Sequence, residues 1–348
     1  MKQIFLVVTG LLFSFSIYAQ NIEKLGKLYA QKEYAKVIEF GQEELKNYPD
    51  HPNVSMLIGR AYADSKQFEK AIPFLEKGTV KENNPDWVQA WSYVYLGNCY
   101  YATGEYIKSK ESIKTCINLN ATENSTKNAL KLLETFQMTS FYDDWEIVES
   151  ENIRFHFQES KNIADKELFI KDREKAYEEI NKFFNAKPYK KIDFFVWDNP
   201  KQAKRKLGQV LGFANSNLCA INSRNNQTRG HEITHILVTY GIQPTKWTRL
   251  INEGIATYFD QTNRDRMQIA KESLAGKEIK IIDLWENPKK FPDDYNYTVG
   301  GALIAYLFEN GSEEQMKRLL KDQTVTSARS IYPNFDKLIV DFTAKLKQ

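Results

Sequence analysis

The chain has 348 residues, of which 42% are hydrophobic and 13% aromatic, enough apolar material for sizeable cores. At roughly 150 residues per domain, a chain of this length is expected to form two domains. Its 48 Lys and Arg nearly balance its 45 Asp and Glu, and a net charge of +3 does not favour nucleic acid as a partner.

Residues 1–19 have the pattern of a signal peptide. Lys2 precedes an apolar stretch at 4–17, and the small residue Ala19 ends the segment. The apolar stretch is shorter than the roughly 20 residues that cross a membrane. No cysteine follows the expected cleavage point, as a lipid anchor would require. We therefore expect a periplasmic or secreted protein without a stable membrane anchor.

The next segment, at 20–140, repeats itself. Tyr34, Phe68 and Tyr106 stand at equivalent places, separated by 34 and then by 38 residues. The first offset is the period of tetratricopeptide repeats, which this segment resembles, and each such repeat is a pair of helices. A helix from about Ser125 to Phe136 is expected to cap the stack.

The resemblance to tetratricopeptide repeats implies a concave groove that binds a peptide or a protein partner. A role in bracing the neighbouring domain has equal weight. Gly59, just before Tyr62, and Gly97, just before Tyr100, are expected to mark the places where paired helices pack closely.

The three cysteines, Cys99, Cys116 and Cys219, allow at most one internal bridge. Export would permit oxidation, but their odd number and scattered placement favour buried thiols.

Residues 141–348 have the pattern of a small sheet followed by helices, which is an α+β arrangement. The expected order is a strand ending at Phe157, a helix at 165–184, a strand at 191–197, a short helix and a strand near Ala220. After Tyr258 the pattern is mostly helical to the end of the chain.

The segment His231-Glu232-Ile233-Thr234-His235 is the H-E-x-x-H pattern of zinc hydrolases. On a helix, histidines four residues apart share a face and can bind one metal ion, while Glu232 can act on a water beside it. The alternative is a helix whose two histidines merely lie on one face. Of the other histidines, His51 is expected in an exposed turn and His156 on a strand, and neither is expected to bind a metal.

A zinc hydrolase needs a third protein ligand and an open position for water. Residues 247–259 have the pattern of a second amphipathic helix, with Glu253 near its start. This arrangement resembles the gluzincin metallopeptidases, above all the peptidase MA-like domains, whose third zinc ligand is a glutamate in an Asn-Glu-Gly or Asn-Glu-Ala segment. Here that segment is Asn252-Glu253-Gly254, and it follows His235 by one residue fewer than the family pattern.

The resemblance implies a Zn²⁺ cofactor bound by His231, His235 and Glu253, with Glu232 as the general base. It also implies a hydrogen-bond donor to the oxyanion on a later segment. Tyr297 is the candidate; its neighbour Tyr295, or a tyrosine that is only packed in a core, are the alternatives.

Two further features are implied by the same resemblance. Thr257 stands where thermolysin-like enzymes have an aspartate that orients a ligand histidine, and its hydroxyl could accept a hydrogen bond from an imidazole. A strand at Leu218 to Ile221 could be the edge strand that pairs with an extended substrate; the alternative is ordinary sheet.

Together these patterns predict an exported zinc metallopeptidase that hydrolyses peptide bonds, with all-α tetratricopeptide-type repeats ahead of a thermolysin-like (gluzincin) catalytic domain. Two other functions remain open. One is a protein-interaction module that uses the helical repeats and keeps the metallopeptidase-like domain as a scaffold with little turnover. The other is a zinc hydrolase that acts on a non-peptide amide.

Overall fold

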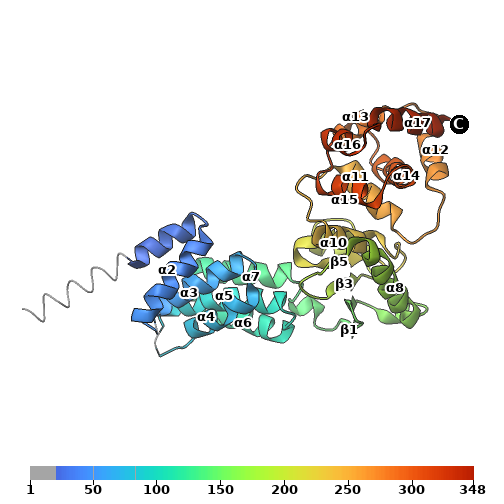
Figure 1. Ribbon diagram of the computed structural model, residues 1–348. Helices are drawn as coiled ribbons and strands as arrows, with labels where there is room; N and C mark the ends of the chain where they lie inside the picture. The colour runs from blue at the N-terminus through green and yellow to red at the C-terminus, as the bar shows by residue number, and fades with distance from the viewer. Residues whose placement is uncertain (1–20, 50, 83) are drawn as a thin grey trace, which may run out of the picture. The chain divides into compact units, whose positions relative to one another are not determined.

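The computed structural model describes residues 21–49, 51–82 and 84–348 (Figure 1). The leader expected at 1–19 lies outside the described residues. The chain divides into two compact units between Asp143 and Asp144, and each unit is described by itself. The described residues are mostly helical and contain one five-stranded sheet, which confirms the expected α+β class. In this part of the chain no helix is both long and apolar enough to cross a membrane.

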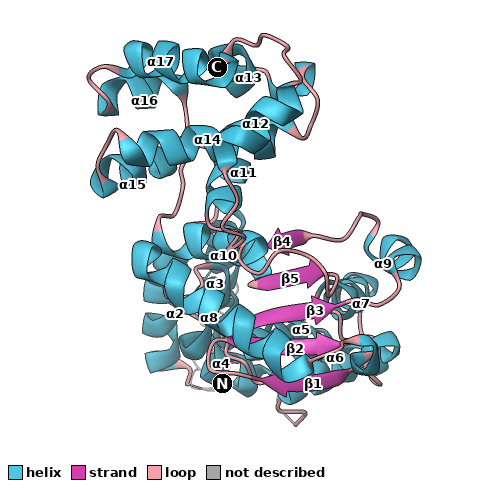
Figure 2. Ribbon diagram, turned by 90° about the vertical axis from the view of Figure 1, so that its right-hand side faces the viewer, coloured by secondary structure: helices cyan, strands magenta, loops and turns pink. Residues whose placement is uncertain are grey.

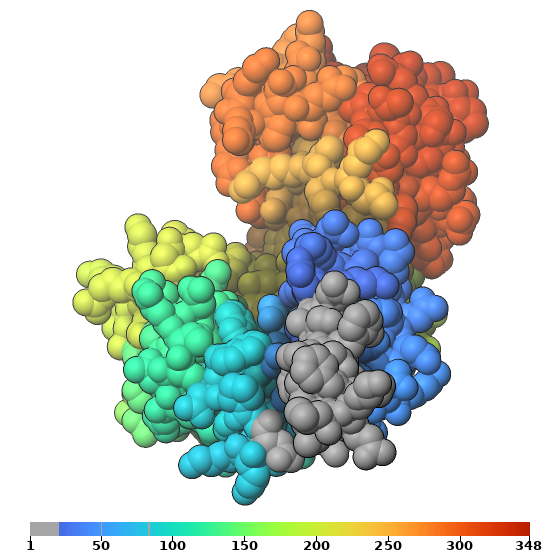
Figure 3. Space-filling model, turned by 90° about the vertical axis from the view of Figure 1, so that its left-hand side faces the viewer, coloured from blue at the N-terminus to red at the C-terminus, as the bar shows by residue number. Residues whose placement is uncertain are grey.

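The first unit is a succession of helices, coloured blue to green in Figures 1 and 3. Residues 21–30 are helical and are followed by α2 (Tyr34–Asn47), α3 (Pro52–Asp64), α4 (Phe68–Gly78), α5 (Asp86–Ala102), α6 (Tyr106–Leu119), α7 (Glu123–Thr135) and a 3-10 turn, η1 (Ser140–Tyr142). From α2 to α7 each helix packs on the next, and α5 also contacts α3 and α7.

One turn geometry recurs in this unit. Lys32, Lys66 and Gly104 each have a left-handed backbone, with φ of 61°, 60° and 81°, at the same offsets of 34 and 38 residues that the sequence shows. In all three turns the following N–H donates to the carbonyl five residues before it, at 2.7 to 3.0 Å. This bond closes the C-terminal end of a helix. The repeat in the sequence is therefore a repeat in backbone conformation.

The small residues of the repeats lie where helices approach closely. A Cβ added to Gly59 would come within 2.6 Å of Leu75 on α4, and one added to Gly97 within 2.4 Å of Ile113 on α6. Both expected packing places are confirmed. The expectation for His51 is wrong: its side chain is buried, because Nδ1 caps α3 by accepting from the Val54 N–H at 3.5 Å.

The second unit contains the sheet. Its strands are β1 (Glu146–Glu149), β2 (Ile153–Phe157), β3 (Ile192–Val196), β4 (Phe213–Asn215) and β5 (Ala220–Ser223), in the order β1-β2-β3-β5-β4. The three central strands are parallel and both outer strands run antiparallel to their neighbours (Figure 2). The connections are η2 (Ser160–Asn162), α8 (Lys166–Phe184), α9 (Pro200–Leu207) and η3 (Ser216–Leu218).

The apolar face of the sheet packs on α8. Phe155 of β2 and Phe194 of β3 contact Phe169 of α8, and all three are buried. Alternation along β2 turns His156 to the opposite face, where its Nε2 lies 2.8 Å from an oxygen of Asp193. The three cysteines are buried free thiols, as expected.

The strand near Ala220 is not at the edge of the sheet. β5 pairs with β3 on one side and with β4 on the other, so of the two alternatives for Leu218 to Ile221 the edge strand is wrong and ordinary sheet is right. Leu218 belongs to η3, and Cys219, with φ of 51°, turns the chain back so that β4 lies beside β5. The strand at this end of the sheet is β4.

The remainder of the second unit is helical. It comprises α10 (His231–Gly241), α11 (Arg249–Tyr258), α12 (Arg266–Leu274), α13 (Ile281–Glu286), η4 (Pro288–Lys290), α14 (Tyr295–Glu309), α15 (Glu313–Lys321), α16 (Val325–Ile331) and α17 (Phe335–Lys347). Apolar residues of α10, α11 and α14 join those of the sheet and α8 in one buried cluster. The helices that carry the candidate site are thus built into the core of this unit.

Candidate metal centre

The H-E-x-x-H segment forms the first turns of α10, as the sequence predicts. Ile233, Ile236 and Leu237 are fully buried and anchor one side of this helix in the core. His231, Glu232 and His235 are only partly buried, because they lie on the side of the helix that borders a cleft. The apolar positions therefore fix which way the two imidazoles point.

Helix α11 lies against α10 and carries the third group. Leu250, Ile251 and Ile255 are fully buried, which leaves Asn252 and Glu253 on the side that borders the same cleft. The backbones of α11 and α14 meet closely at Gly254, where an added Cβ would lie 2.7 Å from carbonyl atoms of Gly300. This close approach sets the position of the turn that holds Glu253.

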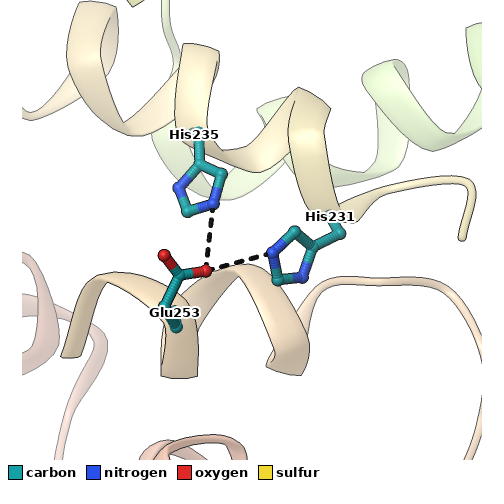
Figure 4. A group of neighbouring side chains, drawn as sticks. All are labelled: His231, His235 and Glu253. Carbon is teal, nitrogen blue, oxygen red and sulfur yellow. Dashed lines mark hydrogen bonds and ion pairs between the residues drawn. The ribbon is translucent and has the colours of Figure 1, made fainter. Parts of the chain in front are cut away.

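Three possible ligand atoms converge between α10 and α11 (Figure 4). One carboxylate oxygen of Glu253 lies 3.3 Å from Nε2 of His231 and 3.4 Å from Nε2 of His235. One ligand atom from each of the three residues lies within 4.8 Å of the others. Among the described residues, this is the one group of three or more His, Cys, Asp and Glu side chains gathered closely enough to hold a metal ion.

The charges of Glu253 and His235 stabilise each other. Burial alone would raise the pKa of Glu253, but the contacts with both imidazoles hold it at about 2. Burial alone would lower the pKa of His235, but Glu253 and the neighbouring Glu232 outweigh burial and raise it. Glu253 is therefore an anion at neutral pH, as a metal ligand must be.

His235 has a second partner, Asn252. The Asn252 amide nitrogen lies 3.3 Å from Nδ1 of His235, and its oxygen, Oδ1, is buried without a hydrogen-bond partner among the described residues. A half-turn of the amide exchanges these two atoms. Oδ1 then accepts from Nδ1–H and is satisfied, and the lone pair of Nε2 is left for a metal ion. The orphaned oxygen thus fits a metal-binding tautomer of His235.

Thr257 does not have the role that the resemblance implied. In the described part of the chain its hydroxyl makes no hydrogen bond to either imidazole, and its methyl group packs against Gly301 of α14. Thr257 is one turn further along α11 than Glu253, at a level of the helix where its side chain meets Gly301 of α14. Beside Glu253 itself, the α11 side chain that contacts His235 is that of the preceding residue, Asn252.

Glu232 borders the cleft beside the three ligand candidates. Burial raises the pKa of its carboxyl group above the ordinary value, and the two imidazoles oppose that shift. A carboxylate with a raised pKa is a stronger base. Glu232 therefore has a more basic carboxylate than an ordinary glutamate, at the border of the cleft.

Tyr297, on the first turn of α14, also borders the cleft. Its ring lies 5.8 Å from the ring of His231, at an angle of 28°. Burial, with a contribution from Glu253, raises the pKa of Tyr297, so the hydroxyl keeps its proton and can donate a hydrogen bond. The alternative candidate, Tyr295, is buried in the core cluster.

The cleft has a volume of about 800 Å³. Its lining includes Phe213 and Ala214 of β4, the outermost strand, as well as Trp247 and Arg249. The sequence reasoning missed Arg249 and the edge position of β4. Nothing in the sequence marks them as part of a site, since both depend on how α11 and β4 pack around α10.

Comparison with known proteins adds no assignment. No family model matches the chain, and no curated protein is significantly similar to it. The chemistry of the site therefore rests on its own residues and their geometry.

Proposed function

We propose that this protein is an exported zinc metallopeptidase. The observation that carries the proposal is the convergence of His231, His235 and Glu253, with contacts of 3.3 and 3.4 Å between the carboxylate and the two Nε2 atoms. Ligand atoms about 2.0–2.1 Å from a tetrahedral zinc ion are about 3.3–3.4 Å apart, so these distances suit one shared ion. Two imidazoles and one carboxylate are a common ligand set for catalytic zinc.

When bound, zinc would supply Lewis acidity, which acidifies water and polarises a carbonyl oxygen. The side chains of the protein supply the rest. Glu232 accepts the proton of the attacking water and passes it to the departing amine. The Tyr297 hydroxyl donates a hydrogen bond to the oxygen on which negative charge develops. Asn252 keeps His235 in one orientation.

A peptide is the favoured substrate because of the strand that borders the cleft. β4 is the last strand of the sheet and pairs with β5 through one of its edges. An extended peptide can add to the other edge as a further strand, with its backbone groups bonded to those of the protein. The cleft volume of about 800 Å³ has room for several residues of such a chain.

The first unit is proposed to be a stack of three tetratricopeptide-type repeats closed by α7. The turn conformation that recurs at 34 and 38 residues supports this assignment. Such stacks commonly bind a peptide or a protein in their inner groove. Export is proposed from the pattern of the leader at 1–19.

A matched pair of substitutions tests the proposal. Zinc per chain and hydrolysis of a mixed peptide library are measured for the wild type, Glu232→Gln and Glu253→Gln. We expect one zinc per chain in the wild type and in Glu232→Gln, with turnover lowered by about 10²–10⁴ in the latter because the base is lost. We expect Glu253→Gln to lose zinc and activity together.

The outcomes separate the alternatives. A wild-type protein that binds no zinc would refute the metal site. Bound zinc without hydrolysis of any peptide would favour the interaction module or a non-peptide amide as substrate. Equal turnover in the wild type and Glu232→Gln would show that Glu232 is not the base.

A further inference from the structure

Arg249 is a permanently charged side chain in the cleft beside the ligand candidates. Among the described residues that line it, Arg249 is the one Lys or Arg. It lies in the first turn of α11, four residues before Glu253 and therefore on the same side of the helix, about 6 Å away along the helix axis. The other charged side chains that line the cleft are the carboxylates of Glu232 and Glu253 and the two histidines.

The Arg249 guanidinium forms only a weak ion pair within the protein, with Asp293. Nη2 of Arg249 donates to an oxygen of Asp293 at 2.9 Å. The side chains of Arg249 and Asp293 are 46% and 67% exposed, so water competes for both charges and the pair adds little stability. A guanidinium has five N–H donors and can bind a carboxylate through two of them, whereas Asp293 engages one.

We propose that Arg249 selects peptides that carry a carboxylate close to the bond to be cleaved. The carboxylate is either the C-terminus of the peptide or the side chain of an Asp or Glu. It replaces Asp293 on the guanidinium in bidentate geometry. This inference rests on the proposed peptidase function and names the substrate class that it acts on.

Electrostatics favour a carboxylate over a neutral group at this position. The two glutamates that line the cleft would repel an anionic ligand, and a cation one turn away from Glu253 offsets that repulsion. The low exposure of His231 and Glu253, 15% and 16%, means that charge in the inner part of the cleft is only partly screened by water. Apart from the proposed zinc ion, a substrate carboxylate therefore has one place among the described lining residues where its charge is matched.

Binding to the zinc-loaded Glu232→Gln protein tests the proposal without turnover. The probes are four short peptides with one common neutral sequence. One ends in an amide and one in a free carboxylate, and the other two are amides that carry a single Glu or a single Gln at the same position. Affinities are measured by titration calorimetry. We expect a gain of about tenfold for at least one carboxylate peptide over its neutral counterpart. The pair that shows the gain identifies the source of the carboxylate.

Further substitutions in the same protein assign the gain to Arg249. Arg249→Gln should abolish it and Arg249→Lys should keep part of it, since lysine has the charge but not the bidentate geometry. Asp293→Asn should increase it, because the competing carboxylate is removed. Arg329→Gln is the matched control. Arg329 also forms an exposed ion pair, with Asp336 at 3.1 Å, but lies on α16 away from the cleft, and its loss should leave the gain unchanged.

The results that overturn the inference differ from those that overturn the function. If the wild type hydrolyses peptides but each carboxylate peptide binds within about twofold of its neutral counterpart, the selectivity is wrong and the peptidase stands. A gain that persists in Arg249→Gln would also overturn it, since the carboxylate would then be bound elsewhere. If the wild type neither binds nor hydrolyses any peptide, both proposals fail.

Discussion

Replacement of Gly254 by alanine tests how α11 is held and, with it, the position of Glu253. A Cβ at residue 254 would lie 2.7 Å from both the carbonyl carbon and the carbonyl oxygen of Gly300. Both are backbone atoms in the middle of α14 and cannot rotate away. The reciprocal contact is equally close, since a Cβ on Gly300 would lie 2.6 Å from the Leu250 carbonyl oxygen. Alanine at 254 must therefore push the two helices apart.

The expected cost follows from two opposed effects. Overpacking in a core costs about 1–3 kcal/mol, and alanine regains up to about 1 kcal/mol of helix propensity over glycine. A net loss of about 1–2 kcal/mol would lower the Tm of a domain of this size by about 2–8 °C. Because α11 shifts relative to α10, zinc affinity should fall as well. Calorimetric melting of the zinc-free protein and competition with a chelator measure the two effects.

Gly26→Ala is the control. Gly26 lies in the helical segment 21–30, and an added Cβ would meet no atom within 4 Å. This substitution should leave the Tm unchanged or raise it, and zinc affinity should not move. If Gly254→Ala melts at the wild-type temperature and binds zinc as tightly as the wild type, the close crossing of α11 and α14 is not what positions Glu253.

Two further predictions concern groups that support the site and the sheet. Asn252→Ala should weaken zinc binding about 10–100-fold, because His235 loses the partner that orients it. Asn252→Asp keeps an acceptor and should retain most of the zinc affinity, as measured by competition with a chelator. An equal loss of affinity in both variants would contradict the orienting role of Asn252. Asp193→Asn should cost about 3–5 kcal/mol, because the buried carboxylate pairs with Lys190 and accepts from His156 at 2.8 Å. Burial alone would raise the pKa of Asp193, but these two partners hold it below its ordinary value of 3.8, so the contribution is present above about pH 4 and is lost as the pH falls further. Urea unfolding from pH 7 to pH 3 should show this loss in the wild type but not in Asp193→Asn, and parallel curves would exclude Asp193 as its source.

The elements that the sequence predicted well are those with a strong local pattern. The apolar face of β2, with Phe155 and Phe157, and the 19 residues of α8 follow clear periods of two and 3.6. β1 and β4 were not predicted as they stand. β1 is mostly exposed and β4 has only three residues, so neither has an alternation long enough to recognise.

For the site, the sequence predicts the geometry within one helix but not the packing of one helix against another. The spacing of His231 and His235 follows from the helical period alone, and a helix is all that is needed to bring them together. Glu253 comes from a second helix, and its approach depends on the packing of α11 between α10 and α14. Glu253 was identified as a candidate ligand through the resemblance to gluzincin metallopeptidases. The contact of Asn252 with His235 and the packing of Thr257 against Gly301 depend on where α11 meets α10 and α14, which the sequence alone does not give.

Helix α11 has only ten residues and carries several of the groups discussed above. It places three side chains at the cleft, those of Arg249, Asn252 and Glu253. Its Gly254 sets how closely it packs on α14. Because a short helix moves as one piece, a tilt of α11 would disturb the proposed metal site and the proposed substrate contact at once. A change confined to the tip of the Arg249 side chain would leave the backbone in place. Under the proposed function, substitutions at Arg249 would therefore change substrate preference while the metal ligands and the base stay in place.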